Sequence, residues 1–250
     1  MSTSWQPPVL NGAAPQTPRA LRTLSVVRMQ LINRQTYIWI PLIILGGAFL
    51  IALAIYAMLA NAGVDGPKFG GGAQAPLWYF LVVGVQALTL TFPFSQAMSV
   101  TRREFYLGTL LTAGLTSAIL AVIAVIGGLL ERATDGWGVN GWFFGLPWIW
   151  EAGPFGALLL NFVVAMLFFV IGFWAATIYK RFGPLWLTVV LVGIGVLLVA
   201  GMWLVGRLDA WAAVFGWFAT VGVVGLSLWG AVLTAVLAAI AFLTLRRAVP

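Results

Sequence analysis

Six long apolar runs dominate this sequence and leave few folds open to it. A helix needs about 20 apolar residues to cross a hydrocarbon core about 30 Å thick. Each run reaches that length, and the last is long enough to cross at a tilt or to project past the lipid headgroups. The sequence therefore predicts an all-α integral membrane protein with a six-helix transmembrane domain over residues 38–250. Its helices are predicted at residues 38–60, 77–98, 107–130, 155–178, 185–206 and 214–245.

The composition agrees with this prediction. Hydrophobic residues make up 62% of the 250-residue chain and charged residues 8%, against about 45–50% and about 25% in soluble domains. The net charge of +7 could indicate nucleic-acid binding. However, the basic residues flank the apolar runs, which favours a membrane protein with no nucleic-acid partner.

The connectors between the runs predict the orientation. Ten of the thirteen basic residues lie before the first run, after the last run, or in the second-to-third and fourth-to-fifth connectors. Only Lys68, Arg132 and Arg207 lie on the other side, together with five of the six acidic residues. Because Lys and Arg are enriched in cytoplasmic loops, we predict a multi-pass plasma-membrane protein with both termini in the cytoplasm.

Two different segments precede the first run. Residues 1–18 contain four prolines among small polar residues, which predicts a disordered cytoplasmic tail. Residues 19–37 predict an amphipathic connecting helix at the cytoplasmic interface. Arg28 interrupts its apolar face, and it could either reach lipid headgroups or meet a partner protein. The predicted polar face holds Arg19, Arg22, Gln30, Asn33 and Arg34, and the apolar face Leu21, Leu24, Val27, Leu31 and Ile32.

The connector between the third and fourth runs is rich in tryptophan, with Trp137, Trp142, Trp148 and Trp150. Tryptophan rings are enriched at the level of the lipid headgroups. An aromatic belt on a half-embedded loop is therefore favoured over a ligand-binding site.

Several absences narrow the chemistry. The chain has no cysteine and no histidine, which excludes thiolate nucleophiles, zinc sites built on these residues and histidine-based serine hydrolysis. No charged residue lies well inside a run, whereas ion-coupled carriers typically hold ionisable side chains there. The glycines at residues 70–72 lack the Gly-Lys-Ser/Thr of a phosphate-binding loop. We expect a non-enzymatic chain without a metal site or cofactor, so that any ATP would be hydrolysed by another protein.

Mildly polar residues within the runs are candidates for a substrate pathway. Four of them share one face of the second predicted helix, two lie on the third and one on the fourth. Such residues also draw membrane helices together, so helix packing is the alternative to a pathway. Pro93 is expected to kink its helix. The candidates are Gln86, Thr89, Pro93, Gln96, Thr112, Thr116 and Asn161.

Two basic connectors have a distinctive order of residue types. Residues 94–109 contain a small residue, a basic pair, an acidic or aromatic residue, and a glycine that opens the next span. This order resembles the link between the second and third spans in a known family, the permease subunits of bacterial type-2 ABC exporters. A second segment resembles the family's basic turn before the fifth span and consists of Tyr179, Lys180, Arg181, Phe182 and Gly183.

The resemblance implies how such a chain would work. A coupling loop would dock into a groove of a separate ABC ATPase subunit, present in two copies, which would hold ATP and Mg. Its arginines would meet an acidic surface, while Phe105 and Tyr106 would serve as apolar anchors. A second permease copy or a related permease would complete the assembly. The loop comprises Ser99, Val100, Thr101, Arg102, Arg103, Glu104, Phe105 and Tyr106.

The expected cargo is hydrophobic or amphipathic, because the candidate pathway residues are neutral and only mildly polar. The link at residues 207–213 is shorter than in several relatives, which carry a longer or re-entrant segment there. The tryptophan-rich connector could cover the outer mouth instead. The alternative is a non-transporting membrane scaffold or regulatory subunit, built from the same packing faces and loops.

Overall fold

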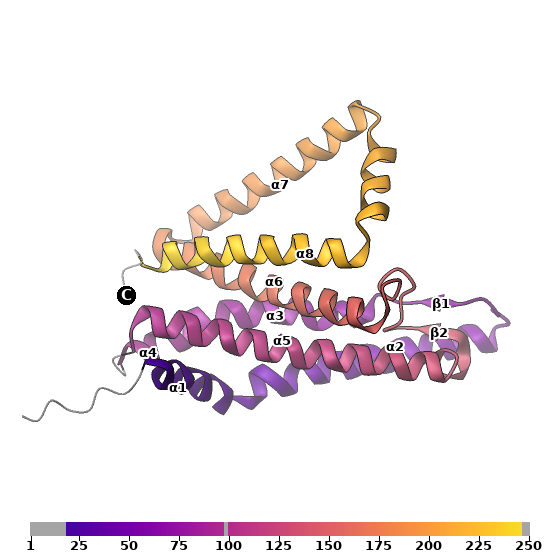
Figure 1. Ribbon diagram of the computed structural model, residues 1–250, viewed down its shortest axis with the longest axis horizontal. Coiled ribbons are helices and arrows are strands. Elements are labelled where there is room, and N and C mark those ends of the chain that lie inside the picture. Colours follow the sequence, from indigo (N-terminus) through magenta and orange to yellow (C-terminus); the bar gives the residue numbers. More distant parts are fainter. Residues whose placement is uncertain (1–18, 98–99, 247–250) are drawn as a thin grey trace, which may run out of the picture.

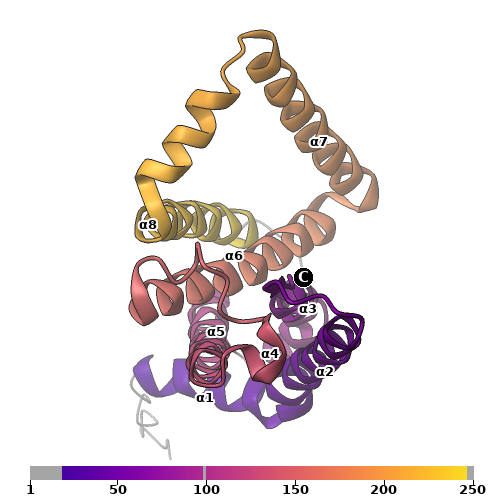
Figure 2. The same cartoon turned by 90° about the vertical axis from the view of Figure 1, so that its right-hand side faces the viewer.

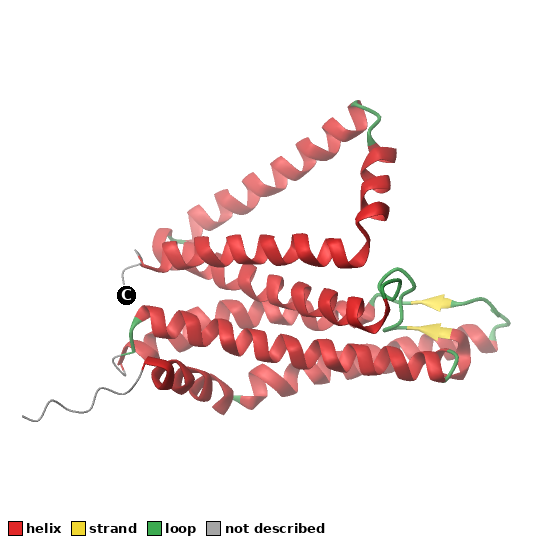
Figure 3. Ribbon diagram, in the orientation of Figure 1, coloured by secondary structure: helices red, strands yellow, loops and turns green. Residues whose placement is uncertain are grey.

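A computed structural model of the chain describes residues 19–97 and 100–246. The chain folds almost entirely into helices joined by short connections (Figures 1 and 3). The helices are α1 (Arg19–Ile32), α2 (Ile40–Asn61), α3 (Ala75–Gln86), α4 (Phe92–Ala97), α5 (Arg102–Ala133), α6 (Gly153–Phe182), α7 (Pro184–Arg207) and α8 (Trp211–Arg246). Shorter elements are η1 (Gln35–Trp39), η2 (Gly72–Gln74), η3 (Ala87–Thr91), η4 (Gly136–Asn140), β1 (Lys68–Phe69) and β2 (Gly141–Trp142).

Six helical stretches in the described part of the chain are long and apolar enough to cross a membrane. They cover Gln35–Asn61, Gly72–Gln96, Arg102–Ala133, Gly153–Phe182, Pro184–Arg207 and Trp211–Arg246. The all-helical class and the six apolar helices predicted from the sequence are therefore confirmed, and they fit a multi-pass membrane protein. The predicted tail at residues 1–18, the end of the second run at Met98, and Ser99 lie outside the described residues.

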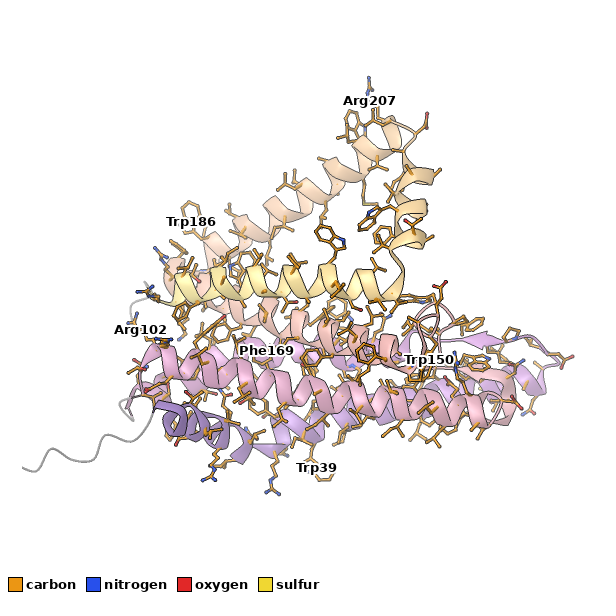
Figure 4. The ribbon with its side chains drawn as sticks, in the orientation of Figure 1. Trp39, Arg102, Trp150, Phe169, Trp186 and Arg207 are labelled. Carbon is orange, nitrogen blue, oxygen red and sulfur yellow. The ribbon has the colours of Figure 1, made fainter. Side chains whose placement is uncertain are left out.

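Five helices form the bundle, in which α2, α3, α5 and α6 lie alongside one another and the second part of α8 lies against α6 (Figures 1 and 2). The aromatic side chains of Phe80, Phe105 and Phe169 are buried between them, and Phe169 lies in the middle of the bundle (Figure 4). The closest crossing joins α3 and α6. A Cβ on Gly84 would overlap the backbone of α6, and one on Gly172 would overlap the backbone of α3. Small residues let membrane helices approach this closely, so that backbone packing holds the pair together.

Helix α7 stands apart from the bundle. It leaves α6 at the end where α8 finishes, and the first part of α8 leads back to the bundle. In Figure 2 these two segments and the bundle outline an open triangle. No residue of α7 is buried within the chain. The bend in α8 lies at Gly222, whose φ of 60° and ψ of −177° are not helical. That combination is essentially restricted to glycine.

The sixth predicted helix is therefore not one continuous rod. Residues 211–221 run in a different direction from residues 222–246 (Figure 1). The second part alone, at about 1.5 Å per residue, is about 37 Å long, which is enough for one crossing. The first part is an additional short helix that the hydropathy pattern merged with it.

The kink expected at Pro93 takes the form of a π-helical segment. η3 ends at Thr91, and Pro93 is the second residue of α4, which follows directly. Proline has no N–H for the usual bond to the carbonyl four residues earlier, and π-helical turns inside helices commonly accommodate such irregularities. Pro93 itself is exposed.

The amphipathic helix predicted over residues 19–37 is shorter, and its buried face differs from the prediction. α1 ends at Ile32, and the side-chain oxygen of Asn33 then accepts a bond from the Thr36 N–H (3.3 Å). Gln30, which the prediction groups with the polar face, lies on the buried face of α1 instead. It is buried against α5, where its Nε2 donates to Thr109 Oγ1 (2.7 Å). Ile32, from the predicted apolar face, is 81% exposed.

Candidate functional site

The turn between α4 and α5 is held by a capping box. Thr101 Oγ1 accepts a bond from the Glu104 N–H (3.3 Å), while Glu104 Oε2 accepts one from the Thr101 N–H (3.1 Å). Gln96 Nε2 also donates to the Val100 carbonyl (3.0 Å). This arrangement satisfies backbone donors at the start of α5, and such caps contribute about 1 kcal/mol. The described part of the turn, Val100 and Thr101, is therefore tied to both α4 and α5.

The two arginines of this turn have different roles. The Nη1 of Arg102 donates to the carbonyls of Leu245 (3.3 Å) and Arg246 (3.2 Å), which end α8. A cation at a helix C-terminus is stabilising because the free carbonyls carry partial negative charge. Figure 4 shows Arg102 at the end of the molecule where α8 finishes. Arg103 is exposed, so it is the arginine of the pair that a partner could contact freely.

Phe105 and Tyr106 do not have the positions expected of docking anchors. Phe105 is fully buried and packs edge-on against Phe92, with ring centroids 5.1 Å apart. Tyr106 is 6% exposed, and its hydroxyl donates to the Ala238 carbonyl (2.6 Å). Both belong to the first turns of α5 and face the bundle. The expectation that they insert into a partner is therefore wrong for this conformation of the chain.

The second basic turn is a tight connection from α6 to α7. Gly183 has a φ of 86°, and its N–H bonds to the Tyr179 carbonyl (2.9 Å). The Arg181 guanidinium lies over the Phe182 ring, 4.6 Å from its centroid, and Lys180 is exposed. The same end of the bundle, called here the termini end, thus carries several exposed basic side chains: Arg28, Arg34, Arg103, Lys180 and Arg246.

The candidate pathway residues do not surround a common channel within this chain. Thr112 and Thr116 are buried, and their hydroxyls bond to carbonyls of their own helix, those of Gly108 (3.0 Å) and Thr112 (3.0 Å). Asn161 likewise bonds the Ala157 carbonyl one turn earlier (2.8 Å). Thr116 borders a cavity of about 10 Å³, about the space of one water molecule. These contacts favour helix packing over a pathway through a single protomer.

The remaining candidates lie on the second candidate span. Gln86 and Thr89 are half-buried, and the Thr89 hydroxyl donates to the Val85 carbonyl (2.9 Å). Gln96 bonds the α4–α5 turn, as described above, and Pro93 faces outward. The polar side chains of Thr89 and Gln96 thus bond to carbonyls four residues away, which favours helix packing over a pathway here as well.

The opposite end of the bundle carries a folded cap, which we define as residues 62–74 and 134–152. The cap is organised around a side chain outside it, that of Glu131 in the last turn of α5. The Glu131 carboxylate is fully buried. Its oxygens accept bonds from three consecutive backbone N–H groups, those of Phe143 (2.6 Å), Phe144 (3.0 Å) and Gly145 (2.5 Å). The Trp137 indole N–H donates a fourth bond (3.0 Å). One carboxylate thus orders the whole tryptophan-rich connector.

The two parts of the cap are joined to each other. β1 pairs in parallel with β2, with Lys68 opposite Gly141 and Phe69 opposite Trp142. Lys68 is buried, and its Nζ donates to the Val139 carbonyl (3.1 Å). The Tyr56 hydroxyl, from α2, donates to the Trp142 carbonyl (3.4 Å). The cap is therefore fixed to both α2 and α5.

The aromatic residues of the cap are mainly packed inside it. Phe143 is fully buried and Trp150 is 4% exposed, whereas Trp148 is half exposed. Phe49 of α2 contacts the rings of Trp137 (4.9 Å between centroids) and Phe143 (5.5 Å). Glu131 was not singled out from the sequence. The available signal was an acidic residue at the end of an apolar run, followed by a glycine-rich segment.

Within the residues that the structure describes, no group of three or more acidic side chains is placed to hold a metal ion. Two groups of polar side chains make several hydrogen bonds each: the α4–α5 turn at the termini end and the Glu131 cluster at the cap end. They lie at opposite ends of the same helix, α5. No protein-family model, no curated protein and no solved structure matches the chain.

Proposed function

We propose that this chain is the transmembrane permease subunit of an ATP-driven ABC exporter that works with a separate ATPase subunit. The observation that carries the proposal is the construction of the α4–α5 turn. It presents an exposed Arg103, while the polar side chains of Thr101, Arg102 and Glu104 bond to groups of the same chain. A turn of this kind can receive a force without unfolding.

The turn is bonded directly or indirectly to three helices, α1, α5 and α8, so a displacement of the turn would also displace these helices. Its capping box is continuous with α5, Arg102 binds the end of α8, and α1 packs on the start of α5 through Gln30 and Thr109. α5 is one unbroken helix of 32 residues, about 48 Å long. Its far end holds Glu131 and therefore the cap. A push at the turn would be transmitted along α5 to the other side of the membrane.

The power source would be a partner protein. In the proposal, the protein lies in the plasma membrane with its termini end on the cytoplasmic side. Two ATPase subunits bind ATP and Mg and dock at that end. The exposed basic side chains of that end would meet an acidic surface, which favours fast and specific association. Buried Phe105 and Tyr106 have no part in this docking; they would link the turn to the bundle.

The transport pathway would lie between two permease copies, identical or related. The polar residues of one protomer are back-bonded to their own helices, so a path through its centre lacks support. α7 and residues 211–221 of α8 have apolar side chains that make few contacts within the chain. A boundary of apolar helices suits a hydrophobic or amphipathic cargo.

The test is to co-express the chain with ABC ATPases encoded beside its gene and to measure co-purification and ATP hydrolysis in proteoliposomes. Arg103→Glu should lower both at least about tenfold, because it reverses a charge at the centre of the proposed contact. Arg207→Glu, an exposed arginine at the opposite end, should leave both unchanged. Unaltered binding and hydrolysis in Arg103→Glu would remove the docking role.

One observation favours the alternative, a non-transporting scaffold or regulatory subunit. Thr112 and Thr116 are buried in helix contacts rather than along a channel, as expected of a protein whose spans only pack. That alternative predicts no ATPase partner. Co-purification without an ATPase, but with another membrane protein, would support it.

A further inference from the structure

Arg132, at the cap end of α5, forms no ion pair with a carboxylate among the residues that the structure describes. It is exposed, and its Cζ lies 4.5 Å from the centroid of the Trp150 ring. Among the described residues, the guanidinium contacts this ring, and no acidic side chain lies within ion-pair distance of the guanidinium. Trp150 is itself fixed, because its Nε1 donates to the Phe144 carbonyl (3.2 Å) and its ring packs on Gly128. Arg132 thus lies over a fixed ring, and no side chain or carbonyl among the described residues accepts a hydrogen bond from its guanidinium.

The surroundings of Arg132 form a hollow that suits an amphipathic anion. The hollow has a volume of about 610 Å³, and Arg132 is the charged residue that lines it. The remaining lining includes one amide side chain, from Asn140, and apolar side chains from Phe69, Trp142 and Pro147. A guanidinium presents paired N–H groups that match the oxygens of a phosphate. The hollow therefore offers one phosphate-binding group beside apolar walls.

A second feature lies along the same helix, deeper in the bundle. A groove of about 180 Å³ with wholly apolar walls separates α5 from α6. It is lined by Ala118, Ala121 and Val122 of α5, and by Phe155, Leu159 and Phe162 of α6. A groove of this shape and lining suits a hydrocarbon chain.

The spacing of the two features matches one lipid leaflet. Ala121 and Arg132 are eleven residues apart, which is about three turns, so they project from nearly the same face of α5. Their separation along the helix is about 16 Å, and half of a hydrocarbon core measures about 15 Å. A molecule with its phosphate at Arg132 would bring its chain to the depth of the groove.

We propose that the cap end of α5 and α6 binds an anionic phospholipid of the adjacent leaflet, with its phosphate on Arg132 and one acyl chain in the α5–α6 groove. The site is independent of the exporter function proposed above. It would tie the cap, through Arg132 and Trp150, to the lipid composition of that leaflet.

The chain contains a matched control for Arg132. Arg207 lies in the last turn of α7, and its Cζ is 5.4 Å from the centroid of the Trp203 ring. It has the same helix-end position and the same kind of aromatic contact, but no residue of its helix is buried within the chain. Helix-dipole and headgroup attraction would act on both arginines alike.

The test is a titration of the purified protein in detergent, followed by native mass spectrometry, with phosphatidylglycerol, phosphatidylcholine and glycerol phosphate as probes. Phosphatidylglycerol should bind most tightly. Arg132→Gln should weaken its binding at least about tenfold, the loss expected for one charge-assisted pair, while Arg207→Gln should not. Val122→Trp, a change at a half-exposed position that fills the groove, should weaken lipid binding without affecting glycerol phosphate.

Three results would overturn the proposal. Arg132→Gln could bind phosphatidylglycerol as the unaltered chain does, or both arginine variants could lose the same amount, which would mean general attraction to headgroups. Glycerol phosphate could bind as tightly as the lipid and Val122→Trp have no effect, which would mean a site for a small anion. Gel filtration of each variant verifies that it is folded before binding is compared.

Discussion

Replacing Glu131 by Gln should release the cap from α5. The carboxylate accepts four hydrogen bonds, two on each oxygen. An amide keeps one oxygen and replaces the other by a donor, so two of the four N–H groups lose their acceptor in either orientation. Each buried donor left unpaired costs about 1–3 kcal/mol. The closed cap should therefore be destabilised by about 2–6 kcal/mol. The loss cannot exceed the free energy of opening the cap, because water then solvates the freed backbone groups.

Hydrogen–deuterium exchange measures this opening directly. At about 2 kcal/mol, the amides of Phe143, Phe144 and Gly145 should exchange about thirtyfold faster in Glu131→Gln, because local opening sets their exchange rate. Glu151→Gln is the control, since Glu151 is an exposed acid of the same connector. If these three amides exchanged at the same rate in Glu131→Gln as in the unaltered chain, the carboxylate would not be what orders the cap.

Two further predictions concern glycines. Gly172→Ala should lower stability by about 1–3 kcal/mol in thermal unfolding in detergent, because the added methyl overlaps the backbone of α3. Gly193→Ala in α7 meets nothing within 4 Å and should cost nothing or gain up to about 1 kcal/mol; equal losses would contradict the described packing. Gly222→Ala should bring residues 211–221 towards the line of residues 222–246, since alanine disfavours the backbone angles of the bend. Distances between spin labels on the two parts would reveal it, and an unchanged distance would show that the bend does not depend on glycine.

The positions of the helices could be predicted because hydropathy is a local property. The fifth predicted run at residues 185–206 differs from α7, Pro184–Arg207, by one residue at each end. The third run missed the first turn of α5, where residues 102–104 are polar. The pattern Thr-x-x-Glu at Thr101 and Glu104 signals a helix start. Applied here, it would have placed Phe105 and Tyr106 inside the helix rather than on a loop.

The polar clusters could not be predicted in the same way, because their partners are distant or lack a side-chain signature. Glu131 binds backbone N–H groups 12–14 residues further on, and every residue except proline has such a group. Gln30 pairs with Thr109, 79 residues away. The helical wheel of α1 contains no trace of this partner, so it groups Gln30 with the polar face. The folded cap and the buried face of α1 are set by tertiary contacts that only the structure contains.

The isolation of α7 has a consequence for how the chain is made. During synthesis, α3, α5 and α6 each emerge after a helix against which they pack, whereas α7 buries no residue against the rest of the chain. Its entry into a bilayer would have to be driven by the transfer of its own side chains into lipid. Those of Val196, Leu197 and Leu198 are all more than half exposed, and they stay exposed after α8 has packed onto α6. A charge introduced near the middle of α7 should therefore act at the insertion machinery, before the folded bundle exists.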